Sequence, residues 1–396
     1  PVQYADYAVW QRGWLQGDVL LGEIDFWRRQ LAGAPRLLEL PTDRPRPAVQ
    51  TFRGATRPVA LAPDLAPALA ALCREEAVTP FMALLAAWAL LLGRHAGQDD
   101  VVVGSPVAGR NRREIEELIG CFLNLLAFRL ELGGAGATFS DLLRRTREVA
   151  LDAYAHQGLP FERLVEEVVH ERDFAISPLF QVLFSLQNVP AAPVRLRGLE
   201  LAPVAMESEV AKFDLSLYVS QGAEGIGGSL EFNTALFDGT TAERLAERFA
   251  RLVAGAVADP ACPLGDLPLL APAEREQLLA GWNSTAEPFP EDLCVHDLVA
   301  AQVARTPEAP AVSSAGERWS YRELWDEAGR LAGRLAALGV GPEALVAVRM
   351  ERSPRMLAAL LGVLRAGGAW VPLDPAHPEE RLAFILEDAR VRVVVT

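Results

Sequence analysis

Two adjacent glycines near the end of the chain are the first residues whose type could indicate chemistry. Gly367 and Gly368 stand in the stretch LRAGGAWVPLDP, from Leu364 to Pro375. A phosphate loop places its glycines after a strand and before a helix, because the helix N-terminal amides then face the anion. Here they follow a helical pattern and precede a strand pattern, where glycine commonly ends a helix. No GxGxxG pattern follows, so we predict a capping turn in preference to a phosphate site.

Histidines and carboxylates form no complete catalytic set that the sequence can define. None of the five histidines is adjacent to another or four residues from one: His95, His156, His170, His296 and His377. A catalytic pair is one hypothesis for His156 and His170, because four glutamates lie near them in sequence: Glu162, Glu166, Glu167 and Glu171. A simpler hypothesis for His170 is a cation that a helix C-terminus stabilises. No GxSxG nucleophile elbow occurs.

The cysteines give no metal-binding pattern. Cys73, Cys121, Cys262 and Cys294 are far apart, and no CxxC or Cys/His cluster is apparent, so we expect no metal site. Cys73 and Cys121 lie in apolar runs, which predicts buried thiols. This cysteine usage fits a reducing, cytoplasmic setting.

Length and composition predict a folded protein of two or three domains. The 396 residues are 51% hydrophobic and 23% charged, enough to bury sizeable cores. The formal net charge of -14 argues against a nucleic-acid partner, whose phosphates attract Lys and Arg. Lys212 is the only lysine, and we interpret most arginines as solvated surface residues.

Nothing in the sequence predicts a membrane protein. The most apolar stretch, FMALLAAWALLLG (81–93), is shorter than the roughly 20 residues that a bilayer requires, so we expect a buried helix. No stretch of the given residues has the pattern that predicts a signal peptide. The chain starts at Pro1 and ends within the strand-like VRVVVT, so we expect both ends to continue into a longer protein.

Residues 1–258 predict an α+β region. Amphipathic helices are expected at 4–16, 21–33, 63–77, 80–95, 138–156, 160–169 and 240–258, and strands at 51–62, 99–108, 121–132, 180–188, 212–220 and 228–237. Thr138 with Asp141 three residues on is a capping box, and Thr79-Pro80 is a typical helix start. The elements do not alternate strictly, which favours a sheet with several antiparallel neighbours.

Residues 259–292 predict an ordered, proline-rich linker with one short helix. It should lie against its neighbours, because otherwise six apolar side chains would be exposed to solvent. They are Leu267, Leu269, Leu270, Leu278, Leu279 and Trp282.

Residues 293–396 predict a different architecture, a doubly wound parallel α/β sheet. Short apolar strands, including APAVSS (309–314), alternate with helices. Ser353 and Pro354 form a helix start, and Gly339 ends the helix before LVAVRM. The fold class is therefore α/β and α+β, in more than one domain.

Five stretches of the first region resemble the condensation domain of nonribosomal peptide synthetases, which assemble peptides on carrier proteins. YADYAVWQ (4–11) resembles the family's Y-x-D-[FY]-A-x-W element, and IGCFLNLLAFRL (119–130) its I-G-x-F-V-N-T element. AHQGLPFERLVEEV (155–168) resembles [HN]-Q-D-x-P-F-E, and RDFAISPLFQ (172–181) resembles R-D-x-S-R-x-P-L-F-Q. Residues 230–253 are similar to the end of that domain. Their order and spacing also match.

The last hundred residues resemble the start of an adenylation domain. WSYRELWDEAGRLAGRL (319–335) is similar to the first adenylation signature, and LRAGGAWVPLDPAHPEER (364–381) to the second. The resemblance implies a condensation part at 1–258, a linker at 259–292, and the first part of an AMP-binding domain at 293–396.

The resemblance implies two chloramphenicol-acetyltransferase-like lobes with a tunnel between them, where a carrier-bound amine attacks a carrier-bound thioester. The family's HHxxxDG motif and its lysine-bearing phosphate loop are both absent from this sequence. We therefore expect the segment alone to be inactive and to bind no cofactor. The parent module implies ATP, Mg²⁺ and 4'-phosphopantetheine. Implied partners are upstream and downstream peptidyl carrier domains, the N-terminal condensation lobe and the rest of the adenylation domain.

The candidate site residues are the matched motif positions, and none is expected to be catalytic or to bind a metal. The condensation positions are Tyr4, Asp6, Trp10, Asn124, His156, Pro160, Phe161, Arg172 and Asp173. The adenylation positions are Tyr321, Glu323, Gly367, Pro372 and Asp374. They would line the tunnel or brace the fold. Gly158, Leu125, Ala175 and Ile176 depart from the family pattern, in which Asp, Thr, Ser and Arg are usual.

Two other functions are alternatives. A standalone acyltransferase that uses coenzyme A would have the same lobe fold, but it has no reason to carry the strand–helix repeat from Ala309 onward. A non-catalytic docking scaffold for carrier proteins would bind a carrier domain without chemistry.

Overall fold

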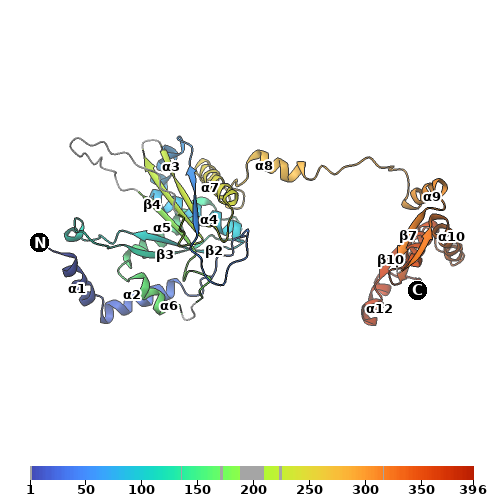
Figure 1. The fold of residues 1–396 in the computed structure, drawn as a ribbon, viewed down its shortest axis with the longest axis horizontal. Helices are drawn as coiled ribbons and strands as arrows, with labels where there is room; N and C mark the ends of the chain where they lie inside the picture. The colour runs from blue at the N-terminus through green and yellow to red at the C-terminus, as the bar shows by residue number, and fades with distance from the viewer. Residues whose placement is uncertain (1, 135, 170–172, 188–208, 223–224, 315) are drawn as a thin grey trace. The chain divides into compact units, whose positions relative to one another are not determined.

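The computed structural model divides the chain into two compact units, residues 1–283 and 284–396 (Figure 1). It describes residues 2–134, 136–169, 173–187, 209–222, 225–314 and 316–396. A six-stranded sheet organises the first unit, and two smaller sheets organise the second.

The first unit contains most of the elements that the sequence predicts. Its helices are α1 (Tyr4–Trp14), α2 (Gly17–Gln30), α3 (Leu65–Glu75), α4 (Pro80–Ala96), α5 (Phe139–Ala155), α6 (Phe161–Val168), α7 (Gly239–Ala258) and α8 (Pro272–Glu276). Its strands are β1 (Gly54–Ala60), β2 (Asp100–Val107), β3 (Asn124–Glu131), β4 (Val182–Gln187), β5 (Leu215–Gly222) and β6 (Gly225–Asn233).

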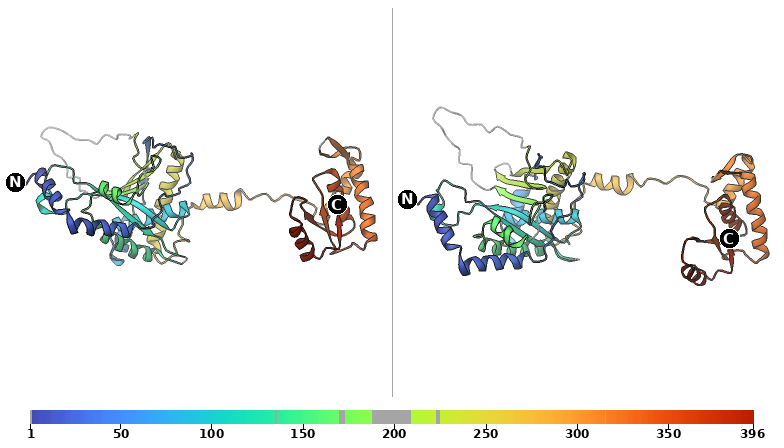
Figure 2. Two further views of the ribbon diagram at one scale, coloured as in Figure 1. Left: turned by 90° about the horizontal axis from the view of Figure 1, so that it is seen from below. Right: turned by 60° about the horizontal axis from the view of Figure 1, so that its bottom comes forward.

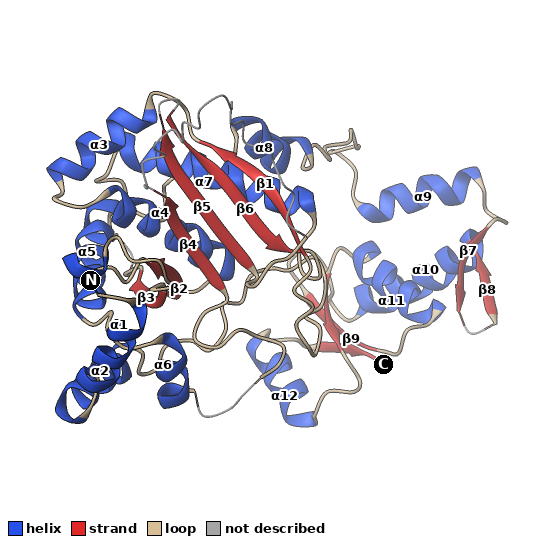
Figure 3. Cartoon of the chain, turned by 60° about the vertical axis from the view of Figure 1, so that its left-hand side comes forward, coloured by secondary structure: helices blue, strands red, loops and turns tan. Residues whose placement is uncertain are grey.

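The large sheet mixes parallel and antiparallel pairs, which confirms the predicted α+β class. Its order is β1-β6-β5-β4-β2-β3. The pairs β1/β6, β6/β5 and β2/β3 are antiparallel, whereas β4 runs parallel to both β5 and β2. Figure 3 shows β4, β5, β6 and β1 from the side away from α7.

Helix α4 is the centre of the core. Every residue from Met82 to Gly93 is buried, and the helix contacts α5, α7, β2 and β4. The predicted buried helix at 81–93 is therefore confirmed. Among the described residues no single helix is long and apolar enough to cross a membrane, although α3 and α4 together pass as a pair bent by 102°.

The predicted helix starts are confirmed by their hydrogen bonds. The Thr138 hydroxyl accepts from the Asp141 amide at 3.2 Å, and the Asp141 carboxylate accepts from the Thr138 amide at 3.0 Å. Thr79 caps α4 in the same way. Each cap satisfies amides that have no partner inside the helix, so local sequence fixes these boundaries.

The linker packs as predicted only over its first half. Arg94 donates to the carbonyl oxygens of Leu264 and Leu267 at 3.3 and 2.6 Å, and Arg251 donates to Leu269 at 3.0 Å. Beyond α8, Leu279 is 58% exposed and Trp282 is 66% exposed, so the prediction that these two side chains are covered is wrong. The bounds 259–292 stay a prediction.

The second unit contains a three-stranded parallel sheet. Its helices are α9 (Val295–Arg305), α10 (Tyr321–Ala337), α11 (Pro354–Arg365) and α12 (Glu379–Asp388). Its strands are β7 (Pro310–Ser314), β8 (Glu317–Ser320), β9 (Leu345–Arg349), β10 (Ala369–Leu373) and β11 (Val393–Val395). Strand β9 lies between β10 and β11 and is parallel to both. Figure 2 shows the long helix α10 in orange beside these strands.

Helices cover both faces of the parallel sheet, as a doubly wound fold requires. Val346 and Val348 of β9 pack with Val363 of α11. The residue between them, Ala347, faces the other side and packs with Leu382 of α12. Because successive side chains in a strand alternate faces, one apolar strand serves two cores.

One strand of the predicted alternation lies elsewhere. The segment APAVSS forms β7, but β7 pairs antiparallel with β8 in a separate two-stranded sheet. Gly316, with φ +85°, lies in the turn between them. The short connection allows only a hairpin, since a parallel crossover needs a dozen or more residues.

The adjacent glycines form the predicted helix cap. Gly367 has φ +83°, and its amide donates to the Leu364 carbonyl oxygen at 3.0 Å. A Cβ on Gly368 would lie 2.8 Å from Val340 Cγ1. The first glycine therefore allows a left-handed turn, and the second allows the Val340 side chain to approach the backbone closely.

Replacing these glycines tests the cap. Gly367→Ala should lower the free energy of unfolding of the second unit by about 1 kcal/mol, because alanine is strained at positive φ. Gly333→Ala, inside α10 with open space around it, should raise it by about 0.5 kcal/mol. Chemical denaturation measures both, and stabilisation by Gly367→Ala would contradict the cap.

Candidate functional site

The aromatic helix α1 packs on the loop that leads into β3. The Tyr4 hydroxyl donates to the Cys121 carbonyl oxygen at 2.9 Å. The ring centroids of Tyr4 and Tyr7 lie 5.1 and 4.9 Å from that of Phe122. A Cβ on Gly120 would lie 2.4 Å from the Tyr4 ring. The first two condensation-like motifs therefore form one packed contact, which needs glycine at its centre.

Two arginines complete this contact. The Arg112 guanidinium carbon lies 4.0 Å from the Trp10 ring centroid, and that of Arg110 lies 4.4 Å from the Phe122 centroid. Arg110 also donates to the Ile115 carbonyl oxygen at 2.6 Å. Cation–π contacts of this kind hold a loop without a regular element. Arg112 is exposed, which fits the interpretation of most arginines as solvated residues, whereas Arg110 is half-buried.

Asn124 joins the second motif to the third. Its amide nitrogen donates to the carbonyl oxygens of Gln157 and Leu159 at 3.0 and 2.8 Å. Its amide oxygen accepts from the backbone amide of Phe161 at 3.0 Å. Phe161 is the first residue of α6 and Pro160 precedes it. One side chain therefore pairs three backbone groups of the turn that leads into the first residue of α6.

These motifs surround a cavity of about 220 Å³. Its lining comes from α1, from the loops on either side of β3's start, and from the turn before α6: Tyr4, Tyr7, Trp10, Gln11, Trp14, Gly109, Asn111, Arg112, Cys121, Phe122, Leu123, Asn124, Gln157, Gly158, Pro160 and Glu162. A Cβ on Gly158 would lie 2.8 Å from the Trp14 ring, so a larger residue at this position would require Trp14 to shift. Asp6 does not line this cavity. Its carboxylate instead accepts from the Gln3 amide at 2.9 Å, at the start of α1.

His156 has a different partner from those predicted. Its Nδ1 lies 3.3 Å from Glu23 Oε2, and its ring stacks on Phe26 at 3.8 Å between centroids. Its carbonyl oxygen accepts from the Trp27 indole at 3.1 Å. Burial raises the pKa of Glu23, and the nearby His156 lowers it. The hypothesis of a pair with a glutamate later in the chain is wrong for His156, which holds α2 against α5.

Two of the glutamates that lie near His156 in sequence pair with arginines instead. Glu167 lies 2.8 Å from Arg28, and Glu166 lies 3.1 Å from Arg163. His170, Glu171 and the candidate Arg172 lie outside the described residues.

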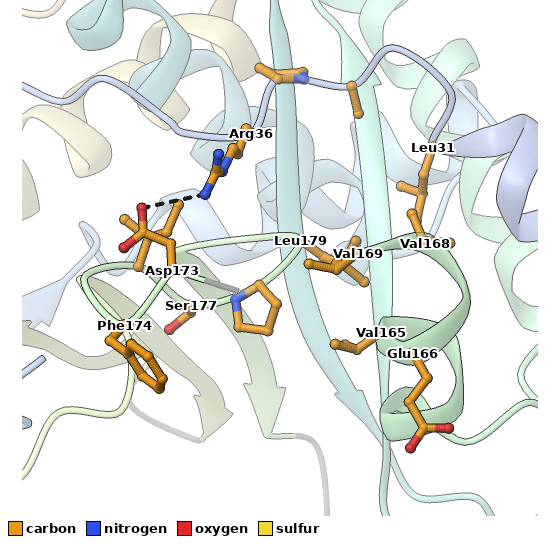
Figure 4. Close-up of a pocket in the computed structure, with 14 residues that line it drawn as sticks. Leu31, Arg36, Val165, Glu166, Val168, Val169, Asp173, Phe174, Ser177 and Leu179 are labelled. Atoms are coloured by element: carbon orange, nitrogen blue, oxygen red, sulfur yellow. Dashed lines mark hydrogen bonds and ion pairs between the residues drawn. The ribbon is translucent and has the colours of Figure 1, made fainter. Parts of the chain in front are cut away.

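A larger cavity of about 680 Å³ lies beside the fourth motif (Figure 4). Asp173 lies at its side, where the carboxylate is 3.4 Å from Arg36 and also accepts from the Ala175 amide at 2.8 Å. Val165 and Val169 give it an apolar wall next to α6. This hollow could hold an apolar group, with Asp173 and Arg36 at the polar side.

Gln181 fixes an extended backbone segment beside the fourth motif, a role that the sequence analysis did not predict. Its side chain accepts from the Leu38 amide at 2.9 Å and donates to the carbonyl oxygens of Arg36 and Ser177. Gln98 bonds the same extended segment, accepting from the Glu39 amide at 2.8 Å. Gln181 is the last residue of the fourth motif, and its place in that motif is the sequence feature that could have identified it.

The adenylation motif positions shape the second unit. Glu323 caps α10, where its carboxylate accepts from the Ser320 amide at 2.7 Å. The Tyr321 amide donates to the Ala309 carbonyl oxygen at 3.0 Å. Pro372 and Asp374 line a hollow of about 480 Å³ at the carboxyl ends of β9 and β10. Ligands of parallel α/β sheets commonly bind at this edge.

The cysteines differ from prediction at two places. Cys73 is buried and burial raises the pKa of its thiol to about 11, but Cys121 is exposed, so its predicted burial is wrong. Cys294, His296 and Asp297 present ligand atoms within 4.8 Å of one another, a cluster that the sequence analysis did not identify. Asp297 caps α9 there, and the positive end of a helix disfavours a cation.

Comparison with known proteins identifies the family. Residues 1–279 match the condensation domain model, and residues 299–396 match the AMP-binding enzyme model. The chain belongs to the nonribosomal peptide synthetases. It is 49% identical over its whole length to part of a linear gramicidin synthase polypeptide from Brevibacillus parabrevis. It is 45% identical to malpinin synthetase of Mortierella alpina. It spans only 5% of the length of each.

Solved structures of the family have the same fold. A holo four-domain nonribosomal peptide synthetase, bound to AMP and glycine, matches 95% of this synthetase chain with a TM-score of 0.79 and 26% identity. The match covers 30% of that protein. The X-domain from teicoplanin biosynthesis matches 68% of the chain, and 62% of its own length, with a TM-score of 0.63 and 28% identity.

Truncating Asn124 tests the link between the motifs. Asn124→Ala should lower the free energy of unfolding by about 2 kcal/mol, because it leaves partly buried backbone groups unpaired. Hydrogen exchange should show lost protection at the Phe161 amide. The matched control is Asn111→Ala, since Asn111 lines the same cavity without a hydrogen bond to any described residue. Equal loss in both variants would contradict the assigned role.

Proposed function

We propose that this chain contributes the C-terminal lobe of a condensation domain and the first part of an adenylation domain to one synthetase module. The observation that carries the proposal is the joining of three condensation motifs around one cavity, through Tyr4, Asn124 and Phe122, in a chain that continues into an AMP-binding match. The bounds that we propose are 1–258, 259–292 and 293–396.

The reaction of the parent module is amide-bond formation between carrier-bound thioesters. The amine nitrogen of the acceptor attacks the thioester carbonyl carbon of the donor. A C–N bond forms, the C–S bond breaks, and the departing sulfur gains the proton that the amine loses. We assign the matched residues of this lobe to positioning: Asn124 and Tyr4 fix the loops at the cavity, and Asp173 fixes the turn beside the larger hollow.

The adenylation part would contribute to ATP-dependent activation of an amino acid. In the parent module, ATP with Mg²⁺ would supply the adenylyl group that activates the amino acid, with pyrophosphate as the leaving group, and carrier domains would supply the phosphopantetheine thiol. The segment's only lysine, Lys212, lies in the first unit, so the second unit has no lysine for a phosphate. In this segment, the hollow lined by Pro372 and Asp374 lies at the sheet edge where a nucleotide would bind. We expect the segment by itself to bind no cofactor.

The partners follow from this proposal. Peptidyl carrier domains would bring both thioesters, and the N-terminal lobe and the remaining adenylation domain would complete the two sites. A cytoplasmic location, without membrane or nucleic acid, fits the net charge of -14 and the free cysteines. The AMP-binding match of residues 299–396 supports this proposal over a standalone acyltransferase.

Activity assays of matched lengths test the proposal. The purified 396-residue segment should show neither ATP–pyrophosphate exchange nor amide formation between loaded carriers. The complete module should show both, because only it contains the HHxxxDG motif and the phosphate loop. Exchange by the segment alone would overturn the expected inactivity, and a complete module that forms no amide would overturn the assigned reaction.

A further inference from the structure

One face of β5 and β6 carries mostly polar side chains, whereas their other face belongs to the core. In β5, Leu215, Leu217 and Val219 are buried on the side of the helices. Ser216, Tyr218 and Ser220 alternate with them and therefore lie on the opposite face. Figure 3 views that face of β4, β5, β6 and β1.

The same alternation holds in the neighbouring strand. Leu230 and Phe232 of β6 are in the core, so Ser229 and Glu231 lie on the polar face. Glu231 is opposite Thr56 of β1 on one side and Ser216 of β5 on the other. Directly cross-strand side chains lie about 5 Å apart, so these three groups form one row.

This row and the next border a hollow of about 310 Å³. Its lining belongs to four strands: Thr56, Gln187, Tyr218, Val219, Ser220, Gly228, Ser229 and Glu231. The polar side chains of the lining are hydroxyls, the Gln187 amide and one carboxylate, in contrast to the aromatic cavity at α1. A Cβ on Gly228 would lie 1.9 Å from the Tyr218 carbonyl oxygen, so the close approach of β5 and β6 requires glycine at this position.

The charged form of Glu231 is destabilised by partial burial. Burial raises its pKa, while the Ser216 hydroxyl and the charge of Lys212 lower it. Burial and the charge of Glu231 also raise the pKa of Tyr218. A half-buried carboxylate opposed by desolvation destabilises the fold in its charged form, so a role outside stability is the expected reason for it.

We propose that Glu231, flanked by Ser216 and Tyr218, binds the amino group of the acceptor aminoacyl thioester. The inference rests on the proposed condensation function. Of the two reacting groups, the thioester offers no hydrogen to a carboxylate, whereas the amine offers two or three. A carboxylate in a partly desolvated hollow therefore selects the amine, through a charge-assisted hydrogen bond. Glu231 is in this account a positioning residue of the acceptor site.

Kinetics of the complete module with purified, loaded carriers tests this assignment. Glu231→Gln should raise the KM for the aminoacyl acceptor carrier about 10-fold to 100-fold, because a charge-assisted bond is lost. The KM for the donor carrier should not change. Glu247→Gln is the control, since it removes the same charge from an exposed position on α7.

A competitor without the amine separates binding from folding. Wild type should bind the aminoacyl carrier more tightly than a carrier with the matching des-amino acyl group, and Glu231→Gln should abolish that difference. Tyr218→Phe keeps the carboxylate and should retain most of the difference, so it is the control for a change in the same hollow that leaves the charge in place. An unchanged acceptor KM in folded Glu231→Gln, or preserved discrimination, would overturn the inference.

Stability gives an independent readout with a defined sign. The raised pKa means that folded Glu231 holds its proton to higher pH than the unfolded chain does. Its contribution to stability is therefore present below the ordinary pKa of about 4.5 and is lost as pH rises through the folded pKa. Glu231→Gln should thus raise the Tm at pH 7 while weakening acceptor binding. A lower Tm together with weaker acceptor binding in Glu231→Gln would indicate a structural role and overturn the inference. A wild-type module that forms no amide would instead contradict the proposed function.

Discussion

The burial of α4 is the constraint on which the first unit depends. Its residues from Met82 to Gly93 are all buried between the sheet and the neighbouring helices. Each large apolar side chain that is fully buried contributes about 1.5–3 kcal/mol, so this one helix supplies a large share of the driving force. The sheet must then turn one complete face toward α4, α5 and α7. On the other face, β5 and β6 carry mostly polar residues.

Outside the sheet, amide side chains pair the backbone groups that regular elements pair elsewhere. Asn124 fixes the turn before α6, and Gln181 with Gln98 fixes the extended segment at 36–39. Buried backbone groups must be paired, and a single Asn or Gln can pair several. The motif residues Asn124 and Gln181 therefore have a structural role in the contacts that the described residues make. Glu231 is the contrasting case, because burial opposes its charge.

The sequence by itself determined the local features. Helix caps at Thr79, Thr138 and Ser353 depend on residues three positions apart, and the cap at Gly367 depends on one backbone angle, so a short window contains the cause. Strand and helix periodicity also assigned the α+β and doubly wound classes, and the quoted motifs identified the family.

Only the tertiary structure decided which distant groups meet. His156 meets Glu23 across more than a hundred residues, although several glutamates lie closer in sequence. Cys121 proved exposed in an apolar run, and β7 left the parallel sheet for a hairpin. The polar row at Glu231 became visible only when the register placed Thr56 and Ser216 on either side. Such contacts depend on how the chain closes over α4, and local sequence does not encode that closure residue by residue.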